Sequence, residues 1–204
     1  MIIDPAPQGT KEWEKARLGL PTASQFHRIV TPKTLKPSGQ ATDYRNELLA
    51  EWKVGRPLVE LSSGLMQRGN VMEQEARRWY EFVTDNTVEE VGLCLTDDGR
   101  FGASPDGLIG DDRLLEIKCP GPKKHVSYMV GSAKPQMDYR CQIQGQLLVT
   151  GRQGVDFVSY HPDMEPVLVR CEREDDVIER LTVALEEFWK EMGRGRAAME
   201  GATP

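Results

Sequence analysis

The chain has 204 residues, of which 39% are hydrophobic and 28% are charged, and its formal net charge is −6. This composition is typical of a globular protein with a sizeable core, and it excludes wholesale disorder and collagen-like or low-complexity chains. The acidic balance excludes a protein that coats nucleic acid through overall positive charge. Any binding to DNA therefore requires a local basic surface or a metal ion.

The four cysteines lie at least 22 residues apart, at positions 94, 119, 141 and 171. This spacing excludes CxxC redox motifs and zinc ribbons, and sparse cysteines are typical of a reducing compartment. The first 15 residues, MIIDPAPQGTKEWEK, lack the basic and apolar regions of a signal peptide, and no apolar run approaches membrane-spanning length. We therefore expect a cytoplasmic protein without a membrane partner.

The N-terminal part of the chain has helical patterns. Residues 10–30 predict two short helices that are broken at residues 19–21, with Thr22 or Ser24 as a possible cap of the second. A loop rich in Pro, Gly and Lys follows at 31–40. The apolar spacing then predicts a helix over 41–55 and a longer one over 64–84. The expected apolar stripe of this longer helix consists of Met72, Ala76, Trp79, Tyr80 and Val83.

The pattern then changes to that of a mixed α/β fold. Strands are predicted at 88–95, 100–109, 113–119, 154–160 and 166–171. Helices are predicted at 122–150, most clearly from 136 to 149, and at 174–192. This order predicts a mixed central β-sheet flanked by helices within one domain, 1–204. Its expected parts are an N-terminal helical part at about 1–86, a sheet core at about 87–171 and a C-terminal helix at about 172–204.

Charge is unevenly distributed along the chain. Residues 1–60 contain nine Lys and Arg against seven Asp and Glu, a net charge of +2, whereas residues 171–200 contain five against nine, a net charge of −4. Charge alone favours two solvated faces. If one face contacts DNA, the N-terminal third is the better candidate.

The stretch around SPDG and LEIK carries the chemistry. Asp106 lies at a turn, while Glu116 and Lys118 are two residues apart on the next predicted strand and therefore share a face. Leu115 and Ile117 point to the opposite, apolar face. Two carboxylates suit Mg²⁺, and the lysine is placed to hold or polarise a water that attacks a phosphodiester. The pattern P-D-x9-E-x-K is weak by itself, and its plain alternative is a surface hairpin in which Glu116 and Lys118 merely pair.

Four motifs in order resemble one family. ASPDGLI and LLEIKCP are accompanied by WEKARLGLPTASQF, RGNVMEQEARRWYEF and YRCQIQGQLLV, which together span residues 12 to about 150. They resemble the phage lambda exonuclease and YqaJ-type recombinases of the PD-(D/E)XK nuclease superfamily. The resemblance implies an α/β restriction-endonuclease-like core.

The resemblance also implies roles for residues of the central site. Asp106, Glu116, the Ile117 carbonyl and Glu73 match the metal ligands, and Lys118 matches the catalytic lysine, so the four side chains are the candidate catalytic residues. From the residues alone, Glu73 stands beside the apolar stripe of its helix, where pairing with Arg77 is the plainer interpretation.

A second set matches the family's pocket for a 5′-terminal phosphate: Arg17, Ser24, Ser104 and Gln142. Arginine offers a planar charged fork for phosphate, and hydroxyl and amide groups add neutral donors. The plainer alternatives are a surface charge for Arg17, a helix cap for Ser24 and an ordinary polar helix residue for Gln142.

Four further residues are candidate DNA contacts. Lys33 lies where the family has an arginine, so attraction to phosphate is retained but a forked contact is in doubt. Leu65 and Met66 lie where the family has an apolar wedge at the duplex end, and core packing is the alternative. Tyr139 lies one turn before Gln142, where it either borders the site or packs as a core aromatic.

The resemblance implies a Mg²⁺-dependent 5′→3′ exonuclease, with Mn²⁺ as a substitute, that digests one strand of linear double-stranded DNA from 5′-phosphorylated ends. It implies 5′-mononucleotides and a 3′ single strand as products, a homotrimeric ring, and a single-strand annealing protein as partner in phage-type recombination. The alternatives are a repair or structure-specific endonuclease of the same superfamily, and a DNA-end-binding recombination adaptor.

Overall fold

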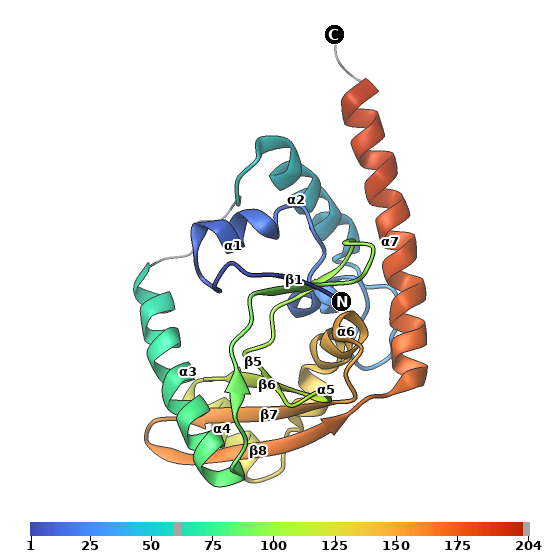
Figure 1. Cartoon of the computed structure of the whole chain (residues 1–204). Coiled ribbons are helices and arrows are strands. Elements are labelled where there is room, and N and C mark those ends of the chain that lie inside the picture. Colours follow the sequence, from blue (N-terminus) through green and yellow to red (C-terminus); the bar gives the residue numbers. More distant parts are fainter. Residues whose placement is uncertain (59–62, 202–204) are drawn as a thin grey trace.

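The computed structural model describes residues 1–58 and 63–201, and for residues 63–70 it describes the backbone alone. Two sheets organise this part of the chain (Figure 1). The larger sheet has the strand order β2 (Val88–Glu89), β5 (Gly107–Ile109), β6 (Arg113–Lys118), β7 (Gly154–His161) and β8 (Met164–Glu172). The smaller sheet has the order β1 (Ile2–Asp4), β3 (Leu93–Leu95) and β4 (Gly102–Ala103).

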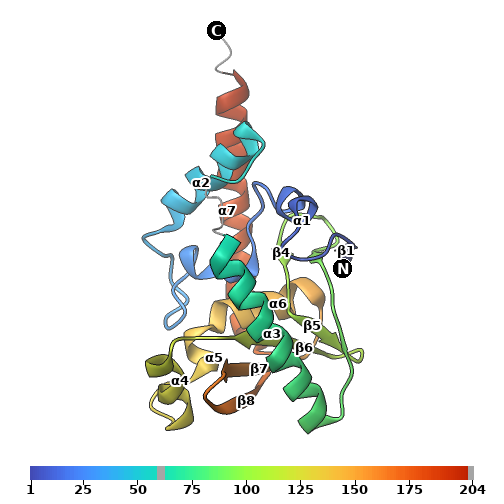
Figure 2. The same ribbon diagram turned by 90° about the vertical axis from the view of Figure 1, so that its left-hand side faces the viewer.

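Helices cover both faces of the larger sheet, which confirms the predicted mixed sheet between helices. The helices are α1 (Lys11–Ala16), the 3₁₀ helix η1 (Ala23–Arg28), α2 (Ala41–Val54), α3 (Ser63–Thr84), α4 (Pro122–Met129), α5 (Pro135–Asp138), α6 (Arg140–Thr150) and α7 (Asp175–Gly201). Figure 2 shows α3 in front of the sheet and α6 behind it. No helix among the described residues is both long enough and apolar enough to cross a membrane.

β6 lies at the centre of the larger sheet. It pairs with β5 in antiparallel and with β7 in parallel orientation. The parallel pair requires a crossover, and α4, α5 and α6 provide it. Leu115 and Ile117 pack toward α3, whereas Leu114 packs toward α6. Alternation along the strand therefore places Glu116 on the α6 face, as the sequence predicted.

α6 can lie close to η1 because residue 145 is a glycine. A Cβ at Gly145 would lie 2.5 Å from Cδ2 of the Phe26 ring. The N-terminal segment that carries η1 is thereby held against the helix that backs β6. This packing positions the N-terminal residues beside the end of β6.

Several predicted boundaries were wrong. The segments 88–95 and 100–109 each divide between the two sheets, as β2 and β3 and as β4 and β5. At Gly92, between β2 and β3, a Cβ would lie 2.4 Å from carbonyl oxygens of the N-terminal segment, so the backbone bends closely around β1. β1 itself was missed because its pairing with β3 joins residues that are far apart in sequence.

Helix boundaries were also wrong in three places. The predicted helix over 122–150 is three helices, because Gly131 adopts a positive φ of 69° and Pro135 starts a new helix. The C-terminal helix extends to Gly201 instead of residue 192. Val83, expected in the apolar stripe of α3, is exposed, whereas Ala76 and Tyr80 of that stripe are buried.

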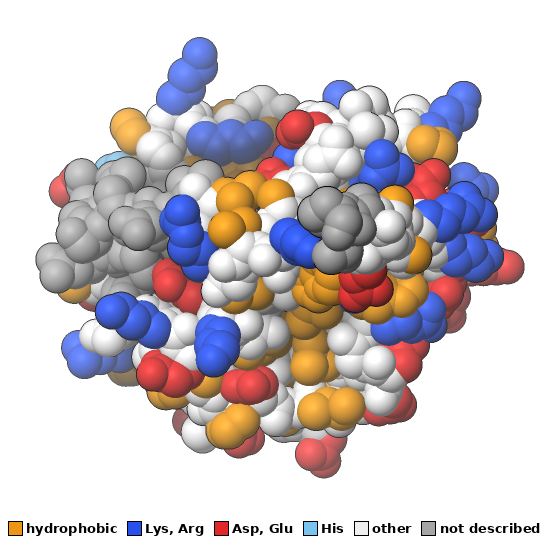
Figure 3. All heavy atoms as spheres, turned by 90° about the horizontal axis from the view of Figure 1, so that it is seen from above, with side chains coloured by type: hydrophobic (Ala, Val, Ile, Leu, Met, Phe, Trp, Pro, Cys, Tyr) orange, Lys and Arg blue, Asp and Glu red, His pale blue; other side chains and the backbone are white. Residues whose placement is uncertain are grey.

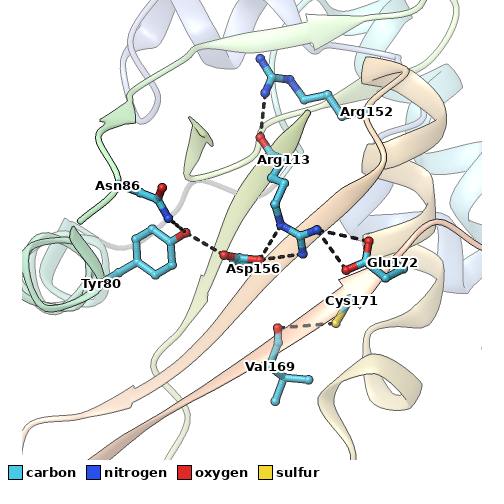
Figure 4. A network of polar contacts seen from close by, with 8 residues as sticks. All are labelled: Tyr80, Asn86, Arg113, Arg152, Asp156, Val169, Cys171 and Glu172. Carbon is cyan, nitrogen blue, oxygen red and sulfur yellow. Dashed lines mark hydrogen bonds and ion pairs between the residues drawn. The ribbon is translucent and has the colours of Figure 1, made fainter. Parts of the chain in front are cut away.

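A buried polar network joins α3 to the sheet (Figure 4). The carboxylate of Asp156 on β7 is 1% exposed, and it accepts hydrogen bonds from Tyr80 Oη at 2.7 Å and Arg113 Nε at 2.8 Å. Arg113 also pairs with the exposed Glu172. Because charged groups in low dielectric need partners, this network ties three elements into one arrangement.

We expect Asp156→Ala to lower the free energy of unfolding by about 3 kcal/mol, because it leaves buried donors without their acceptor. Urea denaturation of the purified variant measures this loss. Glu172→Ala is the matched control, since it removes the exposed carboxylate from the same arginine and should cost less than about 1 kcal/mol. Equal losses in the two variants would contradict the role of burial.

Candidate functional site

The end of β6 runs past the end of β5, and Asp106 fills the gap. The backbone N–H of Asp106 donates to Leu115 O at 3.0 Å, and its Oδ2 accepts from the Ile117 N–H at 2.5 Å. The carboxylate of Asp106 thus lies beside Glu116, as the turn-and-strand pattern predicted. Because the N–H and C=O of one strand residue point to the same side, the Ile117 carbonyl also points toward this gap.

Glu116 is buried, with 1% of its surface exposed. Its Oε1 accepts from Gln142 Nε2 and forms an ion pair with Lys118, and its Oε2 accepts from Gln146 Nε2 at 2.5 Å. The pairing of Glu116 with Lys118 was expected of a plain surface hairpin. Burial rules out that surface hairpin, because an acidic residue is rarely buried without a structural or functional need.

The charges of the site influence one another strongly. Burial and the neighbouring Glu116 raise the pKa of Asp106 well above its ordinary value. Burial alone would lower the pKa of Lys118, but Glu116 and Asp106 outweigh it and raise this pKa. Two carboxylates therefore repel each other in low dielectric, and one ammonium group only partly compensates them.

A pocket of about 160 Å³ joins these residues to the predicted phosphate set. Its lining includes Asp106, Glu116 and Lys118 together with all four predicted phosphate-binding residues, Arg17, Ser24, Ser104 and Gln142. These seven residues come from five different parts of the sequence. The fold therefore brings both predicted sets together in one cleft.

Arg17 is the cation of the phosphate side of this pocket. Its guanidinium lies 4.3 Å from the centroid of the Trp13 ring, and Nη2 donates to Thr22 Oγ1 at 3.2 Å. No carboxylate lies within ion-pair distance of Arg17 among the described residues, so it is not the ordinary paired surface charge that was the alternative. Burial lowers its pKa. An unpaired, half-buried guanidinium is suited to bind an anion.

The hydroxyl groups beside Arg17 are held by a short chain of hydrogen bonds. Trp13 Nε1 donates to Ser104 Oγ at 3.1 Å, and the hydroxyls of Thr22 and Ser24 lie 3.4 Å apart. Neither Thr22 nor Ser24 caps η1 through its side chain, so the capping alternative is wrong. Ser24 and Ser104 present two neutral hydroxyl groups to the same pocket as Arg17.

Glu73 lies on the other side of Asp106. It lines a neighbouring pocket of about 580 Å³ with Asp106, Arg77 and Trp13. Burial raises the pKa of Glu73, while Lys118 and Arg77 oppose this rise. The expected alternative, an ion pair of Glu73 with Arg77, is not formed, because Arg77 pairs with Glu90 at 2.7 Å and donates to Asp106 O at 3.0 Å.

The donor set of this cleft fits a hard divalent cation. Mg²⁺ is commonly held by one or two carboxylates, with water and substrate phosphate completing its shell. Asp106 and Glu116 provide two mutually repelling carboxylates, which a cation would relieve. Within the described ranges, no group of three His, Cys, Asp or Glu side chains forms a ready metal cage. Glu73 is therefore near the pair but does not complete a preformed site.

The four low-ranking DNA-contact candidates fall in different places. Lys33 is exposed in the loop after η1 and lines none of the pockets described above. The side chains of Leu65 and Met66 lie outside the described residues. Tyr139 stacks on Phe157 with ring centroids 5.3 Å apart, and Lys118 Nζ lies 5.5 Å from its ring centroid, so it both packs in the core and borders the site.

Sequence analysis missed three residues of the pocket: Trp13, Thr22 as a partner of Arg17, and Gln146. Trp13 precedes Arg17 by four residues, and Gln146 follows Gln142 by four. Residues four apart share one side of a helix, so this spacing was the available signal.

Comparison with known proteins supports the same interpretation. Residues 12–153 match the YqaJ-like viral recombinase domain. The chain belongs to this family. An uncharacterized protein of Acanthamoeba polyphaga mimivirus is 29% identical over 165 residues, which are 74% of this chain but only 28% of that relative's length.

Solved structures show the same fold. The alkaline exonuclease LHK-Exo from Laribacter hongkongensis is 36% identical and has a TM-score of 0.82, with 94% of this chain and 96% of that one covered. Its complex with dAMP matches with a TM-score of 0.83. A phage-related exonuclease from Haemophilus somnus, 14% identical over 88% of this chain and 96% of that one, has a TM-score of 0.68 and shows the likeness of fold alone.

These findings confirm the resemblance and the fold class drawn from the motifs. They also support the predicted enzyme class, a DNA exonuclease. The roles of individual residues remain predictions that the geometry above makes specific.

Proposed function

We propose that this protein is a Mg²⁺-dependent 5′→3′ exonuclease, with Mn²⁺ as a substitute, that digests one strand of linear double-stranded DNA from 5′-phosphorylated ends. Its products are 5′-mononucleotides and a 3′ single-stranded overhang. The whole chain, 1–204, acts as one nuclease domain in the cytoplasm.

One observation carries this proposal. A single small pocket is lined at one side by an unpaired arginine with two hydroxyl groups, and at the other by two carboxylates with a lysine. An anion site beside a candidate hydrolytic centre is what selection of a chain end requires, because the terminal phosphate must dock before the next phosphodiester reaches the carboxylates.

The residues of the pocket divide the work between them. Arg17, Ser24 and Ser104 bind the terminal phosphate, and Gln142 adds its second amide hydrogen, because only one is needed for Glu116. Lys118 directs its ammonium toward the attacked phosphate and holds the attacking water. Asp106, Glu116, Glu73 and the Ile117 carbonyl would hold a divalent ion, which supplies charge neutralisation at phosphate oxygens and a water of lowered pKa.

The related LHK-Exo has been solved with dAMP, a deoxynucleoside monophosphate. A ligand of this class in a relative that is 36% identical supports mononucleotides as products here.

Digestion of a linear duplex labelled at either the 5′ or the 3′ end, in Mg²⁺, tests the proposal. We expect early release of the 5′ label as mononucleotide, while a covalently closed circle stays intact. Nicking of the circle would instead establish the alternative endonuclease. Binding to duplex ends without any cleavage would establish the end-binding adaptor.

We expect Arg17→Ala to reduce the preference for 5′-phosphorylated over 5′-hydroxyl ends by at least about 10-fold, since a charge-assisted hydrogen bond contributes about 1.5–3 kcal/mol. The ratio of initial rates on the two substrates measures this preference. Arg28→Ala is the matched control: Arg28 also stacks on an aromatic ring, Tyr44 at 4.6 Å, but it is already paired with Asp43 and Glu47. An unchanged ratio in Arg17→Ala would refute the phosphate role.

We also propose that the protein forms a homotrimeric ring and works beside a single-strand annealing protein. Figure 3 shows basic and acidic side chains intermixed on the face seen from above, with apolar side chains between them. A chain of net charge −6 can encircle DNA if assembly turns its basic side chains toward the lumen. Light scattering of the purified protein tests the trimer, and a monomer under assay conditions would contradict it.

A further inference from the structure

We propose that Gln146 is a positioning residue for the metal site: its amide orients Glu116, and its carbonyl accepts a hydrogen bond from a water held by the bound cation. The inference rests on the proposed divalent-metal function. It assigns a role to a residue outside the motifs that carry the family resemblance.

Gln146 and Gln142 hold the carboxylate of Glu116 between them. They lie four residues apart on α6 and therefore on one face of the helix. Gln142 Nε2 donates to Oε1 of Glu116, and Gln146 Nε2 donates to Oε2, each at 2.5 Å. Since both ends of the carboxylate are held, its plane cannot rotate freely about the last side-chain bond.

The two oxygens of Glu116 are not equally occupied. Oε1 accepts from Gln142 and pairs with Lys118, whereas Oε2 accepts from Gln146 alone in the structure. A carboxylate oxygen has two acceptor directions, so Oε2 has one direction left. Gln146 thereby determines which lone pair of Glu116 remains available to a cation.

The other end of the Gln146 amide has no partner. Gln146 is 1% exposed, and its Oε1 is buried without a hydrogen bond among the described residues. Buried polar atoms are usually satisfied, and an unpaired one requires an explanation. Gln146 lines the same pocket as Asp106 and Glu116, and a water on a cation has hydrogens to donate. The unpaired oxygen is thus the acceptor that such a water needs.

Gln144 shows what a purely structural glutamine looks like on the same helix. It is 2% exposed, its Nε2 donates to Glu172 O at 2.9 Å, and its Oε1 accepts from Glu174 N at 2.9 Å. Both ends of its amide therefore tie α6 to the end of β8 and the start of α7. It does not line the pocket.

Calorimetric titration of Mn²⁺ into the purified protein without DNA tests the inference. We expect Gln146→Met, which keeps the volume but removes the amide, to weaken Mn²⁺ binding about 10- to 100-fold, as loss of an outer-shell partner does. Gln144→Met is the matched control and should lower the melting temperature while leaving Mn²⁺ affinity unchanged. If Gln146→Met does not fold, Gln146→Asn keeps the amide but is too short to reach Glu116, and the same weakening is expected.

The outcomes separate this inference from the function on which it rests. Absence of Mn²⁺ binding by the wild-type protein would overturn the metal-dependent function itself. Equal Mn²⁺ affinity of wild type and the Gln146 variant, or equal weakening in the Gln144 variant, would overturn the positioning role alone. In cleavage assays Gln146→Met should raise the metal concentration for half-maximal rate and leave the preference for 5′-phosphorylated ends unchanged, in contrast to Arg17→Ala.

Discussion

Lys118→Ala is expected to lower the rate of nucleotide release by about 10²- to 10⁴-fold, the contribution usual for a positioned group that acts in proton transfer or charge stabilisation. Lys118 forms an ion pair with the buried Glu116, and both carboxylates keep its pKa above the ordinary value. Its ammonium therefore stays charged where the phosphodiester must lie. Initial rates on a 5′-labelled duplex measure the loss.

Lys124→Ala is the matched control for this prediction. Lys124 likewise pairs with a carboxylate, Asp138 at 2.8 Å, and lies 5.0 Å from the centroid of an aromatic ring, Tyr128. It lies on α4 and does not line the pocket. Retention of full activity by Lys118→Ala, with a correctly folded product, would exclude Lys118 from catalysis.

Asp106→Asn is expected to abolish measurable cleavage and, in EDTA, to raise the melting temperature. Asparagine keeps an oxygen for the Ile117 N–H but removes a carboxylate whose pKa is raised by burial and by Glu116. Relief of about 1 kcal/mol of repulsion corresponds to about 2–4 °C in a chain of this size. The wild-type protein would thus lose stability at this position in exchange for a place to bind a cation.

Asp98→Asn provides the opposite case. Asp98 also accepts a backbone N–H, that of Arg100 at 3.1 Å, but it lies at an exposed turn and pairs with the Arg100 guanidinium. We expect this variant to keep full activity and to melt no higher than the wild type. Thermal melting and cleavage assays of both variants decide the matter, and a fall in melting temperature for Asp106→Asn would contradict stored repulsion at the site.

Part of the candidate site was predictable from local pattern. The alternation of Leu115, Glu116, Ile117 and Lys118 predicts the faces of β6, because side chains along any strand alternate. The turn before β5 likewise places Asp106 beside this strand. Arg17, Ser24, Ser104 and Gln142 were assigned through motif resemblance, since no local rule brings residues so far apart in sequence to one pocket.

Other features depended on contacts that no local pattern contains. The splitting of 88–95 and 100–109 between two sheets follows from pairing with β1 and β6. The hydrogen bond between Trp13 and Ser104 joins residues 91 positions apart. Gln146 was not assigned because a glutamine on a helix has many possible partners, and only the packing of α6 behind β6 selects Glu116.

The sequence by itself determined the family, the α/β class, most helices and the faces of the central strand, because periodicity and ordered motifs are properties of the chain alone. Only the tertiary structure decided that Arg17 has no carboxylate partner among the described residues, that Glu73 lies across Asp106 from the pocket, and that Gln146 holds Glu116. The physical reason is that burial, pairing and mutual repulsion arise between elements, once η1 and α6 pack together behind β6.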